Sequence, residues 1–170
     1  LRELTKRRSR GEPLQHLLGT VEFHGLEFKT DARALIPRPE TEELVDLLLN
    51  REDFTPESIL DLGCGSGVIG LTLFKKLSPS PQRATLSDVS PEALSLALEN
   101  GNALGMNESV RFVESHLLTE IDSAFDLIAA NLPYIPSSEA TELSREVQQD
   151  PALALYGGEK GTELVEESMD

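Results

Sequence analysis

The chain has 170 residues, of which 39% are hydrophobic and 26% are charged, a composition that suits one soluble globular domain rather than two. Its formal net charge of −15 argues against general binding of nucleic acid, because affinity for a phosphate backbone comes mainly from lysine and arginine. No apolar run of membrane-spanning length and no secretory signal is readable, so we expect a cytoplasmic protein that acts on another protein or on a small molecule.

The first third of the chain predicts a helix, a hairpin and a second helix. Residues 1–10 match the last turns of a helix with a solvated basic face, which Gly11 closes. Apolar residues at 21–23 and 26–28 flank a glycine turn and indicate a short hairpin. In the helix predicted over 41–50, the residues expected on one side are Leu44, Val45, Leu47 and Leu48.

Strands and helices alternate in the rest of the chain. The predicted strands are 59–62, 83–87, 110–113 and 125–130, and the predicted helices are 68–77, 91–104 and 161–169. Ser90 is expected to cap the helix that has Pro91 at its first position. Such alternation is typical of an α/β fold with a parallel sheet, helices on its faces and right-handed crossovers. Because four strands leave an open edge, further strands are expected after residue 170.

A glycine-rich turn follows the first of these strands. Glycines let the chain bend sharply there and let a ligand approach the backbone, although such a turn can also simply join a strand to a helix. The predicted cofactor contacts in this turn are Asp61, Gly63, Cys64, Gly65, Ser66 and Gly67. Asp88, at the end of the next strand, is placed to accept hydrogen bonds from both hydroxyls of a ribose. These features fit a dinucleotide and S-adenosylmethionine equally well.

The deciding motif is the tetrapeptide at 131–134, directly after the fourth predicted strand. Ligands of open α/β sheets bind beyond the carboxyl ends of the strands, so this motif and the glycine turn should face one cavity. The Asn131 carboxamide and the Leu132 carbonyl can each accept one N–H of a substrate amide, and Pro133 restrains residue 132 to an extended conformation. Stacking of Tyr134 on the planar group would complete a site for a planar nitrogen, with Asn131, Pro133 and Tyr134 as catalytic residues.

Between residues 11 and 163 the sequence resembles the PrmC/HemK family of peptide chain release factor glutamine methyltransferases. The segments that carry the resemblance are 11–14, 35–42, 63–67, 88–91, 131–134, 150–151 and 157–158. The Arg-Pro-Glu-Thr element at 38–41 is the narrowest of them, and residues 38–42 are expected to line the cofactor side of the cavity or merely to start a helix. The resemblance implies a class I, Rossmann-like methyltransferase that uses S-adenosylmethionine to methylate the side-chain amide of a glutamine in a release factor.

The resemblance also divides the chain and marks two departures from the family pattern. Residues 1–20 are expected to end an N-terminal helical domain and its linker, 21–50 to form a hairpin and a lead-in helix, and 51–170 to form the catalytic domain without its last strands. Leu132 stands where the family usually has proline. In place of the usual aspartate and tryptophan near the adenine, Leu117 is expected to cover the adenine and to contact the cofactor together with Asn131.

Positioning rather than acid–base chemistry is expected to drive the transfer. Two acceptors would orient the poorly nucleophilic amide nitrogen for in-line attack on the methyl group. His16, His24 and His116 are each taken as structural, so no general base is assigned. Cys64 is the only cysteine, which excludes an internal disulfide and a cysteine-based zinc site, and no metal is expected.

Three other functions fit parts of the sequence. A methyltransferase for exocyclic nitrogens of nucleic acid would use a similar tetrapeptide, but the acidic charge counts against it. A catalytically weak binding module is the second alternative, in which Leu132 impairs the site. A dehydrogenase that uses NAD leaves the tetrapeptide unexplained. We expect a monomer whose partner is the release factor, with no contact to nucleic acid or membrane.

Overall fold

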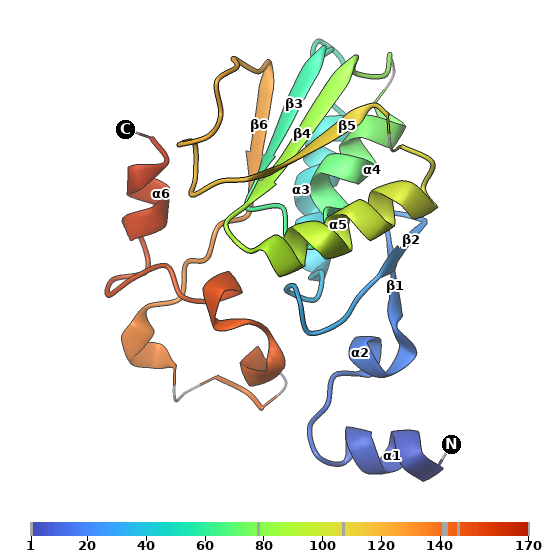
Figure 1. Ribbon diagram of the computed structural model, residues 1–170, viewed down its shortest axis with the longest axis vertical. Coiled ribbons are helices and arrows are strands. Elements are labelled where there is room, and N and C mark those ends of the chain that lie inside the picture. The colour runs from blue at the N-terminus through green and yellow to red at the C-terminus, as the bar shows by residue number, and fades with distance from the viewer. Residues whose placement is uncertain (1, 78, 107, 141–142, 146, 170) are drawn as a thin grey trace.

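The computed structural model describes residues 2–77, 79–106, 108–140, 143–145 and 147–169. These residues form a four-stranded sheet in the order β5-β4-β3-β6 and a separate two-stranded hairpin (Figure 1). All neighbouring strands of the larger sheet run parallel, as the sequence predicted. The strands are β3 (Ser58–Leu62), β4 (Arg83–Asp88), β5 (Val110–Glu114) and β6 (Leu127–Ala130).

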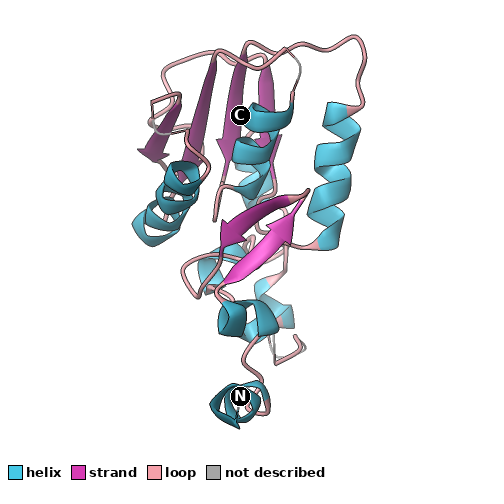
Figure 2. Ribbon diagram, turned by 90° about the vertical axis from the view of Figure 1, so that its right-hand side faces the viewer, coloured by secondary structure: helices cyan, strands magenta, loops and turns pink. Residues whose placement is uncertain are grey.

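Three helices lie together on one face of this sheet (Figures 1 and 2). They are α3 (Pro39–Leu49), α4 (Val68–Lys76) and α5 (Pro91–Ala103). Two successive crossovers, β3 to β4 and β4 to β5, move in the same direction along the sheet, and their common hand puts α4 and α5 on the same side. The main core lies between these helices and the strands, with Ile59, Leu71, Leu73 and Leu86 fully buried in it. On the opposite face a smaller cluster forms around Leu60 and Leu62.

Helix α3 corrects one prediction about its apolar side. Val45 is fully buried and Thr41 is nearly so, whereas Leu47 is 70% exposed. Two residues along a helix turn the side chain through about 200°, so Leu47 lies almost opposite Val45. Leu44 and Leu48, at the flanks of Val45, pack against the core as predicted. The helix also begins at Pro39, two residues earlier than predicted, because proline suits the first helical position.

The N-terminal part contains two short helices and the predicted hairpin. The hairpin strands, β1 (Thr20–Phe23) and β2 (Leu26–Lys29), pair antiparallel, and Phe23 packs edge-on against Phe28 with ring centroids 6.1 Å apart. Before them come α1 (Arg2–Arg8), which matches the predicted helix, and α2 (Leu14–Leu18), which was not predicted. Both phenylalanines are buried in the main core, so the hairpin is part of the same folded unit.

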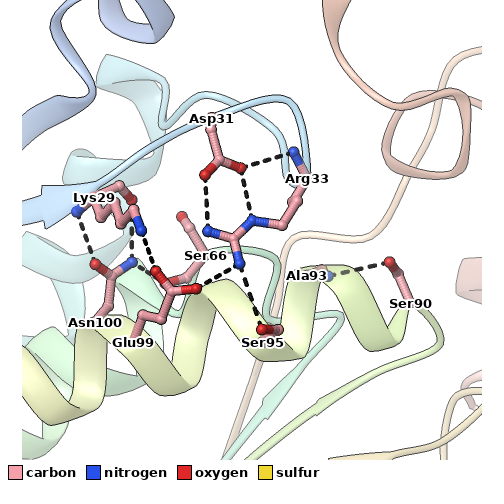
Figure 3. Close-up of polar contacts among 9 residues, drawn as sticks. All are labelled: Lys29, Asp31, Arg33, Ser66, Ser90, Ala93, Ser95, Glu99 and Asn100. Atoms are coloured by element: carbon pink, nitrogen blue, oxygen red, sulfur yellow. Dashed lines mark hydrogen bonds and ion pairs between the residues drawn. The ribbon is translucent and has the colours of Figure 1, made fainter.

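A polar network fixes the hairpin against α5 and the glycine turn (Figure 3). The buried Asn100 side chain accepts a hydrogen bond from the Lys29 amide at 2.7 Å and donates to the carbonyls of Lys29 and Ser66 at 3.1 and 2.9 Å. Arg33 adds a 2.6 Å ion pair with Glu99, the residue directly before Asn100 in α5. The segment that leaves β2 is thereby held beside the turn that follows β3.

The region after β6 is mostly irregular. It includes the short 3-10 helices η1 (Ser137–Glu139), η2 (Val147–Gln149) and η3 (Ala152–Ala154), followed by α6 (Glu163–Glu167). Helix α6 is shorter than the predicted 161–169. It cannot begin at Gly161, because the φ of that residue is +85°, which no helical residue adopts. Within the described ranges, none of the helices combines the length and apolar character needed to cross a bilayer.

Candidate active site

A cavity of about 410 Å³ opens beyond the carboxyl ends of β3, β4 and β6. Its walls include the glycine turn after β3, Asp88 at the end of β4, Leu117 after β5 and residues 131–133 after β6. The volume lies within the range of about 300–1,000 Å³ typical of small-molecule sites. The two motifs expected from the sequence to share one cavity therefore do so.

The glycine turn presents its middle residues to this cavity. Gly63, Cys64, Gly65 and Ser66 line it, whereas Gly67 lies behind them. A Cβ at Gly67 would come within 3.0 to 3.2 Å of three core side chains, so this glycine is needed for packing. A Cβ at Gly63 would lie 3.0 Å from the Leu132 Cδ2 atom, so this glycine lets the tetrapeptide pack against the turn.

Asp88 holds the turn in place and still faces the cavity. One carboxylate oxygen accepts a 2.8 Å hydrogen bond from the Gly65 amide, and the other accepts a 2.9 Å bond from the Ser90 amide. Ser90 in turn caps α5, as predicted, by accepting a hydrogen bond from the Ala93 amide at 3.2 Å. Each carboxylate oxygen has a second lone pair, so Asp88 can also accept from hydroxyl groups in the cavity.

Asp61 lies beneath the turn and does not line the cavity. Its side chain is fully buried; Oδ2 accepts a 2.7 Å hydrogen bond from the Gly70 amide, and Oδ1 has no partner among the described residues. Burial raises the pKa of Asp61 to about 7, the Gly70 amide opposes this, and the charge of Asp88 adds to it. Burial likewise raises the pKa of the Cys64 thiol, so Cys64 stays protonated at neutral pH.

Leu117 reaches the cavity through an unusual backbone conformation. Its φ is +49°, a region that leucine rarely adopts and that costs about 1–3 kcal/mol unless neighbouring contacts enforce it. The Ser115 hydroxyl donates a 2.8 Å hydrogen bond to the Leu117 carbonyl and accepts a 3.1 Å bond from the Glu120 amide. These bonds turn the leucine side chain toward the smaller cluster on Leu60 and Leu62 and into the cavity wall.

The tetrapeptide is arranged partly as expected. Asn131, Leu132 and Pro133 line the cavity, and Leu132 is 9% exposed because it packs in the smaller cluster. Tyr134 is 69% exposed and does not line the cavity, whereas Tyr156, which the sequence did not single out, does. In the sequence, the one feature that could have drawn attention to Tyr156 is its position directly before the glycine pair at 157–158.

The segment before that glycine pair supports the tetrapeptide from behind. The Ile135 amide donates to the Leu155 carbonyl at 3.0 Å, and the Gly157 amide donates to the Ile135 carbonyl at 3.1 Å. A Cβ at Gly157 would lie 2.3 Å from the Pro133 carbonyl oxygen, closer than any side chain tolerates. Only glycine at 157 therefore lets the two backbones approach each other so closely.

The segment before α3 and the first turn of that helix contribute a further wall. Pro37 and Thr41 line the cavity, and the Asn131 Nδ2 atom donates to the Thr41 Oγ1 atom at 3.5 Å. Arg38 forms a 2.5 Å ion pair with Asp150, whose carboxylate also accepts a 3.3 Å hydrogen bond from the Ile36 amide. The resemblance to the family included both segments, 35–42 and 150–151, but the sequence did not predict that they contact each other.

Two of the three histidines lie beside acidic side chains. The His24 Nε2 atom lies 2.7 Å from the Asp46 Oδ1 atom, remote from the cavity, and the His116 Nδ1 atom lies 3.5 Å from the Glu167 Oε1 atom at its rim. His16, the third, has a buried Nε2 atom without a hydrogen-bond partner in the described part of the chain. No group of His, Cys, Asp and Glu side chains suited to a metal ion is found within those ranges.

Comparison with known sequences gives consistent matches. Residues 40–155 match the methyltransferase small domain family. The Release factor glutamine methyltransferase of Deinococcus radiodurans is 44% identical over 160 residues, which cover 94% of this chain and 56% of that protein. The protein of the same name from Lactococcus lactis is 39% identical over 171 residues, which cover 100% of this chain and 62% of that protein. The chain thus spans little more than half the length of these relatives.

Among solved structures, the catalytic domain of hMettl16 in complex with the MAT2A 3'UTR hairpin 6 superposes with a TM-score of 0.68. It is 16% identical, over 85% of this chain and 55% of that one. The Thermus thermophilus 16S rRNA N2 G1207 methyltransferase in complex with AdoMet and guanosine gives a TM-score of 0.56 at 18% identity, over 69% of this chain and 33% of that one. At these identities the likeness shows the fold alone.

Proposed function

The chain belongs to the methyltransferase small domain family, and on that premise we propose that it is the catalytic part of a release factor glutamine methyltransferase. The substrate of the proposed reaction is the side-chain amide of a glutamine in a peptide chain release factor, and the methyl donor is S-adenosylmethionine. The observation that carries the proposal is the shared cavity, in which Asn131 and Leu132 adjoin the glycine turn. The names of the relatives from Deinococcus radiodurans and Lactococcus lactis support the choice of substrate.

The cavity fits the methyl donor chemically. Gly65 leaves space on the cavity side of the turn, since the nearest atom to a Cβ placed there would be the Ala34 Cβ atom at 3.8 Å. Asp88 has lone pairs for the ribose hydroxyls, and Leu117 offers an apolar surface for the adenine. S-adenosylmethionine supplies a methyl group on a positively charged sulfur.

The tetrapeptide holds the glutamine amide. Asn131 Oδ1 and the Leu132 carbonyl each accept one N–H bond, which directs the nitrogen lone pair at the methyl group. Among the described residues neither of these two oxygens accepts another hydrogen bond, so both are free for a substrate. As the nitrogen–carbon bond forms and the sulfur–carbon bond breaks, the two acceptors stabilise the positive charge that develops on nitrogen. The proton then leaves the nitrogen for solvent.

The aromatic surface for the planar amide comes from tyrosine. Tyr134 follows Pro133 and is exposed at 69%, which leaves its ring free to cover a bound side chain. Tyr156 lines the cavity itself and forms a second candidate surface. The proposal further includes a cytoplasmic monomer, contact with the release factor rather than with nucleic acid or membrane, and the division of the chain at residues 20 and 50.

Mass spectrometry of the reaction product tests the proposed function. The full-length enzyme is incubated with S-adenosylmethionine and a bacterial release factor, and in parallel with DNA and RNA. We expect one methyl group on one glutamine of the release factor and none on the nucleic acids. The N131A variant should slow the reaction by about a hundredfold or more, because it removes one of two acceptors. An unmodified glutamine at high enzyme concentration would refute the proposal, and methylated DNA or RNA would support the nucleic-acid alternative.

A further inference from the structure

Asn131 has a hydrogen-bonding neighbour that its proposed role requires. Its Nδ2 atom donates to the Thr41 Oγ1 atom, 90 positions earlier in the sequence, at 3.5 Å. Thr41 is 7% exposed and lines the same cavity. The distance is at the long end of the hydrogen-bond range, as is common for catalytic contacts that tighten when the substrate binds.

A carboxamide has two chemically opposite ends, and only one of them suits the substrate. With Nδ2 turned toward Thr41, the acceptor Oδ1 faces the cavity and can receive an N–H of the glutamine amide. With the amide reversed, its N–H groups would face the N–H groups of the substrate, and no hydrogen bond would form. The neighbour of Nδ2 therefore decides whether Asn131 can hold the substrate.

The threonine hydroxyl makes the productive orientation favourable. A hydroxyl oxygen can accept from Nδ2 while the substrate donates to Oδ1, so both ends of the amide have partners. A valine of the same shape would leave Nδ2 facing an apolar group, which is unfavourable for a partly buried donor. The difference between threonine and valine thus acts directly on the orientation of Asn131.

The first turn of α3 holds Thr41 where this contact needs it. The Thr41 amide donates to the Arg38 carbonyl at 3.0 Å, and the Arg38 side chain is held by Asp150. Pro39 occupies the first helical position and restricts the backbone there. Residues 38–41 therefore not only start α3 but also hold the Thr41 hydroxyl beside Asn131.

We propose that Thr41 is the positioning residue that orients the Asn131 carboxamide for the substrate amide. This proposal rests on the function proposed above. It assigns the recognition of the substrate NH₂ group to Asn131 and Thr41 together. Thr41 does not touch the reacting atoms; it acts through Asn131.

Kinetics of matched variants test the role in catalysis. In the full-length enzyme with a release factor as substrate, T41V should lower kcat about five- to tenfold and leave the affinity for S-adenosylmethionine within about twofold. T41S, which keeps the hydroxyl, should stay within about threefold of the wild type. T72V is the control, because Thr72 is likewise a buried helical threonine but its hydroxyl has no partner among the described residues.

A double-mutant cycle separates positioning from a general loss of structure. If Thr41 acts through Asn131, T41V should slow the N131A variant by less than about twofold. Full additivity of the two changes, or a T41V enzyme as fast as T72V, would overturn the proposal.

The orientation of the amide can also be measured without turnover. The ¹⁵N-labelled side-chain NH₂ signals of Asn131, assigned by their loss in N131D, should shift in T41V but not in T72V. Unchanged signals in T41V would show that the contact does not exist. A wild-type enzyme that methylates no glutamine would instead refute the proposed function, so the two failures are distinguishable.

Discussion

Arg38 and Asp150 lie 112 positions apart in the sequence and form a 2.5 Å ion pair behind the lining of the cavity. The Asp150 side chain is completely buried, while the Arg38 side chain is 36% exposed. Pro37 and Thr41 on one side of the pair, and Pro151 and Leu153 on the other, line the cavity. The pair therefore joins two walls that no element of secondary structure connects.

Removal of the arginine should destabilise the protein in a pH-dependent way. Burial raises the pKa of Asp150, and the Arg38 guanidinium opposes this, so R38M should raise that pKa further. A carboxyl group whose pKa is higher in the folded than in the unfolded protein stabilises the fold at low pH. This stabilisation is lost as the pH rises through the pKa of the folded state. We expect R38M to lose about 1–3 kcal/mol at pH 8 and clearly less at pH 5, measured by urea unfolding. R111M, at an exposed position of β5, is the control; equal losses at both pH values would contradict the prediction.

Asp61 should make the stability of the wild type fall with rising pH. Its pKa is raised from the ordinary value of 3.8 to about 7, so the folded protein binds this proton more tightly than the unfolded chain does. The stabilisation that this proton gives to the folded protein is complete below pH about 4 and is lost as the pH rises to about 7. In D61N the side chain is neutral at every pH. The melting temperature of D61N relative to the wild type should therefore increase between pH 4.5 and pH 8, and a constant difference would argue against a protonated Asp61.

Leu132 should matter for stability as well as for the substrate. It is 9% exposed and packs with Leu60 and Leu62, so L132A should cost about 2–4 kcal/mol in the free energy of unfolding. The matched control is L47A, since Leu47 is 70% exposed and its truncation should cost less than about 0.5 kcal/mol. Similar losses in the two variants, measured by chemical unfolding, would show that Leu132 is not part of a packed cluster.

Gly157 should be required for the shape of the tetrapeptide. A Cβ there would meet the Pro133 carbonyl oxygen at 2.3 Å, so G157A must displace one of the two backbones. We expect methyl transfer to fall by about tenfold to a hundredfold. A misplacement of about 1 Å near the reacting atoms costs up to about a hundredfold in rate. G105A is the control, because no atom lies within 4 Å of a Cβ at Gly105 and only its φ of +76° is strained. Equal activities of the two variants, corrected for the folded fraction, would contradict this reading.

Local patterns in the sequence determined most of the fold and the location of the site. Ser90 and Pro91 marked the start of α5 because capping depends on residues within one turn. The glycine turn and the tetrapeptide could be placed in one cavity because parallel strands present their carboxyl ends at one edge of the sheet. Each of these inferences needs only near neighbours or a general rule of topology.

Tertiary structure alone decided which side chains meet. Nothing in the spacing pairs Arg38 with Asp150 or Thr41 with Asn131, because these contacts join segments whose separation depends on the packing of α3 and of the loops after β6. The same packing put Tyr156 into the cavity wall and left Tyr134 exposed. Periodicity shows which face of an element is apolar, but the partner of a polar side chain depends on how whole elements lie against each other in space.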